Sequence, residues 1–139
     1  MTAQSRHKHR SFDDLLSEMT FDFFGSGQHR VTGEQLLSQS NGVLLDVRSM
    51  REVQALSLTF TGEATVLHIP TNEIPDRWGE IPTDRPVAVF CSAGTRAAIV
   101  YAYLRMMGFE QVRILVGGLT EQASLHKIWA RSMARRQSS

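Results

Sequence analysis

Four short runs of apolar residues alternate along the chain with segments of helical character. The runs that read as buried strands are 43–47, 65–69, 87–90 and 112–116. They are almost continuously apolar, as expected for strands covered on both faces of a parallel sheet. Helices are predicted to begin at Thr32 and Ser49, to form a turn around 76–78, and to span 97–107 and 119–133. Strands that alternate with helices indicate an α/β domain with a mainly parallel sheet.

A further helix is predicted ahead of this region, over residues 12–24, and Gly25-Ser26-Gly27 would end it. Its apolar face would consist of Phe12, Leu15, Leu16 and Met19. Because an apolar face must be covered, this helix either packs against the domain or forms a surface for a partner. We therefore divide the chain into an N-terminal extension with a short helix (1–27), a main domain (28–130) and a basic C-terminal tail (131–139).

The chain has one cysteine, and it lies where a predicted strand ends. Cys91 follows the run 86–90 and heads the loop Cys91-Ser92-Ala93-Gly94-Thr95-Arg96, after which a helix is predicted. The N-terminus of a helix offers free N–H groups and partial positive charge, which favour the nucleophilic thiolate. Gly94 lets the backbone turn tightly, and Arg96 adds a permanent cation. A lone cysteine is often only a small buried apolar residue, but this setting predicts a catalytic nucleophile.

A strand, then Cys-x-x-Gly-x-Arg, then a helix resembles the active-site loop of rhodanese-type sulfurtransferases. Three other segments resemble motifs of that family and occur in the family's order: Val43-Leu44-Leu45-Asp46-Val47-Arg48, His68-Ile69-Pro70 and Val112-Arg113-Ile114-Leu115-Val116-Gly117-Gly118. Each motif alone is modest, but four in this order are fairly specific. The resemblance covers about Arg30 to Trp129.

The resemblance implies a three-layer, rhodanese-like α/β fold, with a five-stranded, mainly parallel sheet and helices on both faces. It implies that Cys91 is catalytic, and that the sulfur donor is bound by Ser92, Ala93, Gly94, Thr95 and Arg96. The residues expected to support the loop from neighbouring elements are Asp46, Arg48 and Glu52. The implied reaction moves sulfane sulfur from thiosulfate or a persulfide, through a Cys91 persulfide, to a thiol, to cyanide or to a sulfur-relay protein. No cofactor or metal is expected.

The chain departs from the family in two places. The family usually has a Gly-His-Ile-Pro-Gly-Ala stretch, which has no counterpart in residues 56–64, so we expect that loop to be rebuilt. Ser92 occupies the position after the cysteine, where some thiosulfate-using relatives carry a cation. The second departure weakens the case for thiosulfate as the natural donor.

The loop is expected to form a nest in which the N–H groups of residues 92–96 converge on the sulfur. Arg96 has two interpretations: it binds an anionic donor, or an acid holds it and it braces the loop. Glu52 follows Arg48 by one helical turn, so these two are predicted to pair. Asp46 is expected to bond backbone groups. Thr95 either bonds the persulfide or caps the helix, and His68 is expected to be structural.

Other functions fit the sequence less well. Cysteine phosphatases use Cys-x5-Arg, whereas Cys91 and Arg96 are separated by four residues, which leaves room for a single sulfur atom rather than a phosphate. Arsenate reduction would need a second cysteine to resolve the intermediate. The main alternative is a module that carries persulfide sulfur from one protein to another, with little turnover on thiosulfate.

Composition narrows the class of protein further. The 139 residues suit one domain, and no run is long and apolar enough to predict a membrane helix or a secretory signal. One cysteine excludes an internal disulfide framework and suits a reducing cytoplasm. The net charge is +1, but residues 1–10 carry +3 and residues 127–139 carry +4, so the rest carries −6. We expect these basic ends to be solvated rather than to bind nucleic acid, and the histidines in His7-Lys8-His9 not to bind metal.

Overall fold

The computed structural model describes residues 9–39, 41–56 and 65–116. Five short strands form one sheet in the order β1-β5-β4-β2-β3, and every neighbouring pair is parallel. The strands are β1 (Arg30–Val31), β2 (Val43–Asp46), β3 (Thr65–His68), β4 (Val87–Phe90) and β5 (Val112–Leu115). The four strands predicted from apolar runs are confirmed, and the mainly parallel sheet is parallel throughout its described part.

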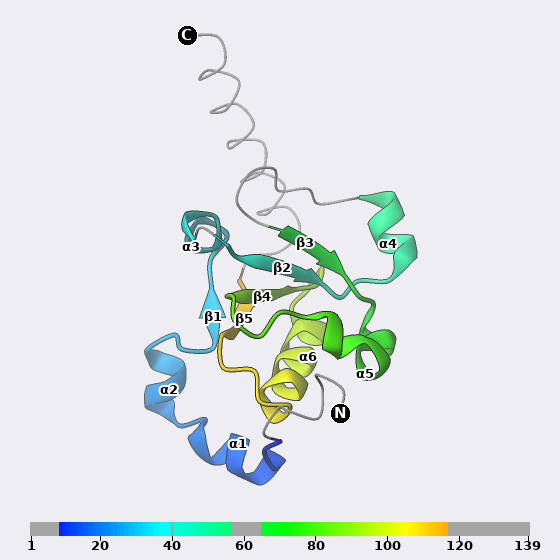
Figure 1. The fold of residues 1–139 in the computed structure, drawn as a ribbon. Coiled ribbons are helices and arrows are strands. Elements are labelled where there is room, and N and C mark those ends of the chain that lie inside the picture. Colours follow the sequence, from blue (N-terminus) through cyan, green and yellow to red (C-terminus); the bar gives the residue numbers. More distant parts are fainter. Residues whose placement is uncertain (1–8, 40, 57–64, 117–139) are drawn as a thin grey trace, which may run out of the picture.

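Helices flank this sheet. They are α1 (Phe12–Glu18), α2 (Phe21–Gly25), α3 (Gly33–Ser38), α4 (Met50–Ala55), α5 (Ile74–Arg77) and α6 (Thr95–Met106), with 3-10 turns η2 (Thr71–Glu73) and η3 (Trp78–Glu80) around α5. In Figure 1, α5 and α6 lie on one side of the sheet and α3 lies on the other. The expected three-layer α/β architecture is confirmed.

The two central strands show how the sequence produces these layers. Side chains alternate between the two faces of a strand, so a strand that is apolar throughout supplies two cores. Val43 and Leu45 of β2 pack in the cluster that contains α5 and α6, whereas Leu44 packs in the cluster that contains Leu36 of α3. In β4 the same alternation places Val89 in the first cluster and Phe90 in the second.

Capping fixes where two of the helices begin. Thr32 and Gln35 form a reciprocal capping box at the start of α3, and Ser49 and Glu52 form another at the start of α4, as predicted. Gly108 follows α6 with φ of 98°, a left-handed conformation that ends a helix and favours glycine. The second box matters for function because it places the Glu52 carboxylate just beyond the carboxyl end of β2.

The single helix predicted over 12–24 is wrong, because the chain forms two helices there. Thr20 is the N-cap of α2, and its hydroxyl accepts a hydrogen bond from the N–H of Phe23, which starts a new helix. The proposed inner face is also wrong in part. Leu15 is 1% exposed, whereas Phe12 and Leu16 are about half exposed. Of the four residues of the predicted face, Leu15 is therefore the buried one, and Met19 is partly buried against the core.

The helix predicted over 97–107 is confirmed as α6, but it is less buried than its apolar sequence suggested. Its buried side chains are Ala97, Val100, Tyr101 and Leu104. Ile99 is 61% exposed, because it lies on the side of α6 that does not face the sheet. None of the helices within the described ranges has the length and apolar character needed to cross a bilayer. The helix predicted over 119–133 and the basic termini lie outside the described residues, apart from His9 and Arg10.

Candidate active site

Cys91 lies at the carboxyl end of β4, immediately before the loop that leads into α6. Its sulfur accepts hydrogen bonds from the backbone N–H groups of Gly94, at 3.0 Å, and Ala97, at 3.3 Å. Gly94 is the N-cap of α6 and has φ of 91°, a left-handed conformation that costs L-residues about 1–2 kcal/mol. This conformation turns the chain so that the loop curls around the sulfur. Two N–H donors and the end of a helix stabilise negative charge there.

We expected the N–H groups of residues 92–96 to converge on the sulfur, and the structure corrects this list of donors. Within that range the N–H group that bonds the sulfur is that of Gly94, and the second donor, Ala97, lies just beyond it. A helix leaves its first N–H groups without partners inside the helix, which is the signal in the sequence that points to Ala97. The N-cap residue, Gly94, has no side chain that could accept a hydrogen bond from the first turn of α6. The Cys91 sulfur accepts one instead, from the N–H of Ala97. Thr95 is exposed and does not cap the helix.

An ion pair closes over the other side of the loop. The two terminal nitrogens of Arg96 donate to the two oxygens of Glu52, with Nη1 to Oε1 at 2.6 Å and Nη2 to Oε2 at 2.9 Å. Arg96 Nη2 also donates to the Ser92 hydroxyl at 2.9 Å, and that hydroxyl is 3.5 Å from Glu52 Oε2. Such two-point pairs fix orientation as well as charge. We call Glu52, Ser92 and Arg96 the loop clamp.

The electrostatics of Glu52 follow from these contacts. Hydrogen bonds from the Arg96 side chain, and next from the Ser49 backbone N–H, hold the pKa of the Glu52 carboxyl far below its ordinary value. The same pair raises the pKa of Arg96, with a smaller contribution from negative charge on Cys91. The Glu52–Arg96 pair is thus ionised on both sides, and Arg96 is near enough to respond to charge on the sulfur.

The predicted pairing of Arg48 with Glu52 is wrong. Arg48 pairs instead with Asp46, through Nη2 to Oδ2 at 2.8 Å and Nε to Oδ1 at 3.0 Å, and both side chains are almost fully buried. Helical neighbours four residues apart meet only if both belong to the helix, and Arg48 precedes the N-cap of α4. Asp46 also accepts the N–H of Arg48, as expected for a residue that bonds backbone.

This buried pair supports the strand that carries Cys91. The Arg48 guanidinium lies over the ring of Phe90, 5.3 Å from its centroid, and Phe90 directly precedes Cys91. His68 Nε2 donates to the carbonyl of Arg48 at 2.7 Å, which agrees with the structural role predicted for it. The three residues expected to support the loop therefore contact two different parts of the site. Asp46 and Arg48 pack under the end of β4, and Glu52 holds the loop.

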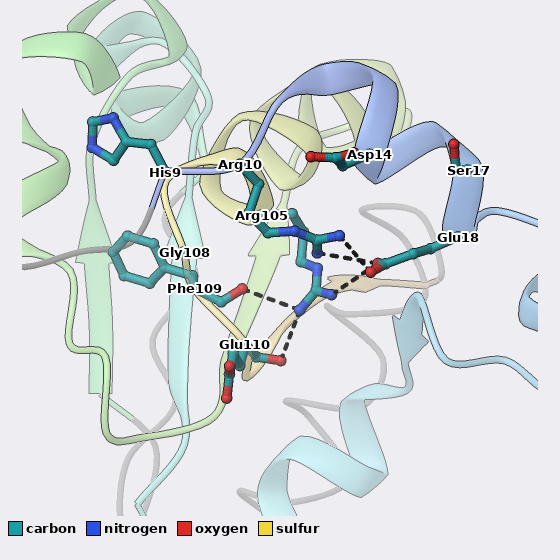
Figure 2. Close-up of a pocket in the computed structure, with 9 residues that line it drawn as sticks. All are labelled: His9, Arg10, Asp14, Ser17, Glu18, Arg105, Gly108, Phe109 and Glu110. Atoms are coloured by element: carbon teal, nitrogen blue, oxygen red, sulfur yellow. Dashed lines mark hydrogen bonds and ion pairs between the residues drawn. The ribbon is translucent and has the colours of Figure 1, made fainter.

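The loop is distinct from the pocket drawn in Figure 2, which lies at the opposite end of α6 and encloses about 760 Å³. Both terminal nitrogens of Arg10 donate to Glu18, and Arg105 lies on the other side of that carboxylate while donating to the carbonyls of Phe109 and Glu110. These contacts join the N-terminal extension to the end of α6. This pocket therefore belongs to the attachment of the extension and does not include Cys91.

The fold and the site define an α/β domain with a cysteine-centred loop at the carboxyl edge of a parallel sheet. Residues 32–124, about two thirds of the chain, match the model of the rhodanese-like domain, and the chain belongs to that family. It is 31% identical over 86 residues to a sulfurtransferase of Allochromatium vinosum, covering 62% of this chain and 76% of that protein. It is also 31% identical over 77 residues to a tRNA sulfurtransferase of Aeromonas hydrophila, of which it covers 16%.

A solved structure agrees with the fold. The rhodanese-related protein of Thermoplasma volcanium superimposes with a TM-score of 0.59 at 23% identity, covering 69% of this chain and 91% of that one. At this identity the likeness bears on the fold alone. It supports the α/β architecture in which the Cys91 loop is placed.

Proposed function

We propose that the protein is a sulfurtransferase that carries sulfane sulfur on Cys91. The observation that carries this proposal is the pair of N–H groups, from Gly94 and Ala97, directed at the Cys91 sulfur. These donors stabilise the thiolate before sulfur transfer, and after it they remain close to the persulfide anion, whose negative charge lies on the outer sulfur, one S–S bond beyond Cys91 Sγ. Membership of the rhodanese-like family and the likeness to named sulfurtransferases support this function.

The reaction has two steps. The Cys91 thiolate attacks the outer sulfur of a donor R–S–S⁻ or of thiosulfate, a new S–S bond forms to Cys91, and the donor's S–S bond breaks to release R–S⁻ or sulfite. An acceptor, either cyanide or a thiolate, then attacks the outer sulfur of the Cys91 persulfide and restores the thiolate. The sulfur moves without net oxidation of the protein. The scheme is covalent and of the ping-pong type.

The loop residues have separate roles in this scheme. Gly94 and Ala97 supply the N–H groups, and Ser92 and Arg96 belong to the loop clamp that keeps those groups in place. Ala93 and Thr95 are the exposed residues of the loop. Cys91 itself is only 4% exposed. We therefore infer that the donor and the acceptor approach the sulfur over these two exposed residues.

The second candidate is a persulfide carrier that receives sulfur from one protein and delivers it to another. The observation that favours it is the ion pair in which Glu52 neutralises Arg96. Because Arg96 is already paired, it offers no free positive charge to a small dianion such as thiosulfate. We infer a cytoplasmic setting for either role, because a reduced thiol is required. A sulfur-relay protein would then be the partner.

Turnover separates the two candidates. The assay follows thiocyanate formation from cyanide, with thiosulfate as donor in one arm and a cysteine desulfurase with cysteine in the other. A sulfurtransferase for small donors turns over in both arms. A carrier turns over only with the desulfurase. The Cys91→Ser variant is the control in each arm, and activity retained by that variant would contradict the proposal.

A further inference from the structure

We propose that Glu52 is a residue that determines donor specificity, because its pairing with Arg96 makes the loop favour persulfides of low net charge over the thiosulfate dianion. This inference rests on the proposed function and goes beyond it by assigning the class of donor. It also assigns a role to a residue outside the loop. The argument depends on the contacts of the loop clamp and on the charge of the two kinds of donor.

The first step is the geometry of Arg96. A guanidinium attracts an anionic substrate when its donor edge is free to face that anion. Here both terminal nitrogens of Arg96 are bonded to Glu52, at 2.6 and 2.9 Å, and the second nitrogen also bonds Ser92. Arg96 and Glu52 are equally accessible, each with 35% of the side chain exposed, so their charges cancel where a donor would approach.

The second step concerns Arg48, the cation that follows the end of β2. It is 1% exposed and bonded to the Asp46 carboxylate, so it offers neither surface nor net charge to a ligand. The residue after Cys91 is Ser92, an uncharged side chain that bonds Arg96. Among the described residues of the loop and of the two strand ends beside it, both arginines are thus paired with carboxylates.

The third step is the charge of the donor. Thiosulfate brings two negative charges close to a thiolate, and the sulfite that leaves also carries two. A hydropersulfide anion brings one, and a positively charged group elsewhere in the donor can cancel it. Repulsion between like charges is strong in a site partly closed from water, and an unpaired cation is needed to offset it. With Arg96 neutralised, the donor with less charge is favoured.

The test is the Glu52→Gln variant, which removes the negative charge and leaves the shape nearly unchanged. Glutamine serves as well as glutamate at the third position of a capping box, so the start of α4 is retained. Loading of Cys91 is measured as a second-order rate constant with two probes, thiosulfate and cysteamine hydropersulfide generated in situ, whose ammonium and persulfide charges cancel. The informative quantity is the ratio of the two rate constants.

The wild-type protein should load faster from cysteamine hydropersulfide. Glu52→Gln should raise the ratio of thiosulfate to persulfide loading by about tenfold, because the cation of Arg96 then acts on the dianion. This gain should shrink as salt is added. The double variant Glu52→Gln/Arg96→Gln, which removes both charges, should return the ratio to its wild-type value. Glu80→Gln breaks a comparable two-point pair with Arg77 outside the site and should leave the ratio unchanged.

Two results would overturn the inference while leaving the proposed function intact. One is an unchanged ratio in Glu52→Gln with both donors still loading Cys91. The other is a wild-type protein that loads from thiosulfate as fast as from the persulfide. Failure of the wild-type protein to load from either donor would instead contradict the proposed function itself.

Discussion

Arg96, in the first turn of α6, forms a two-point ion pair with Glu52, which lies 44 residues earlier in the first turn of α4. The pair joins α4 and α6, two of the helices that start at the carboxyl edge of the sheet. The Arg96 guanidinium also donates to the hydroxyl of Ser92, so the ion pair fixes the loop beside Cys91 as well. A contact between two distant segments thereby determines both the shape and the net charge of the site.

Titration of Glu52 tests this pair directly. The pKa of the Glu52 carboxyl is lowered from its ordinary value of 4.5, with the Arg96 hydrogen bonds as the largest cause. A group with a lowered pKa stabilises the folded state above its unfolded pKa, and this stabilisation is lost as the pH falls through the folded value. The pair should therefore persist at pH 4.5 and break only in more acidic solution. Carboxyl ¹³C NMR should give a midpoint for Glu52 below 4.5, and Arg96→Gln should move it upwards. A wild-type midpoint at or above 4.5 would show that the pair is absent in solution.

Gly94→Ala tests the backbone of the loop. The left-handed φ of 91° is unfavourable for alanine although a Cβ there would meet nothing within 4 Å, so we expect a loss of about 1–2 kcal/mol in the free energy of unfolding. Relaxation of that strain would move the Gly94 N–H away from the sulfur and slow loading of Cys91 by roughly tenfold or more. Gly25→Ala is the matched control, since a Cβ there also meets nothing and Gly25 lacks a positive φ. Equal behaviour of the two variants would contradict the role given to Gly94.

Asp46→Ala tests the support beneath β4. Removing one partner of a buried pair leaves the other charge without compensation, which costs about 3–5 kcal/mol. Both Asp46 and Arg48 are buried, so urea denaturation should show a loss of this size. The exposed pair of Arg77 and Glu80 is the comparison, and Glu80→Ala should hardly change the midpoint. A small effect of Asp46→Ala would show that Arg48 finds another partner or solvent.

Leu15→Ala tests whether the N-terminal extension is an integral part of the folded domain. Leu15 is 1% exposed, and its truncation should lower the free energy of unfolding by about 2–5 kcal/mol. The neighbouring Leu16 is 51% exposed, and Leu16→Ala should change stability by no more than about 0.5 kcal/mol. If both variants are as stable as the wild-type protein, the extension does not pack on the domain in solution.

The fold was largely predictable because its signals are local. The apolar runs of β2 and β4 predict strands buried on both faces, and the boxes at Thr32 and Ser49 predict where α3 and α4 begin. The break between α1 and α2 was missed although Thr20 is a good N-cap residue, because the apolar spacing continues across it. The local pattern of apolar residues thus predicts that a helix or strand exists more securely than it predicts a break within it.

The candidate site was predictable in position but not in its contacts. The sequence predicts that Cys91 follows a buried strand, and the structure places it directly after β4, at the carboxyl edge where parallel sheets commonly bind ligands. The partner of Arg96 could not be predicted, because a residue 44 positions away becomes a neighbour only after the sheet has formed. The spacing of Arg48 and Glu52 suggested a pair that the start of α4 at Met50 prevents. Which acid neutralises which arginine is decided by tertiary structure.

The most direct test of the central claim is the mass of the intact protein after exposure to sulfur donors. The reduced protein is mixed with thiosulfate, with cysteamine hydropersulfide, or with a cysteine desulfurase and cysteine, and is then treated with cyanide. We predict the gain of one sulfur atom, its assignment to Cys91 by peptide mapping, and its loss on addition of cyanide. Cys91→Ser should gain none. Absence of the added sulfur in all three arms, or its presence in the Cys91→Ser variant, would contradict the account.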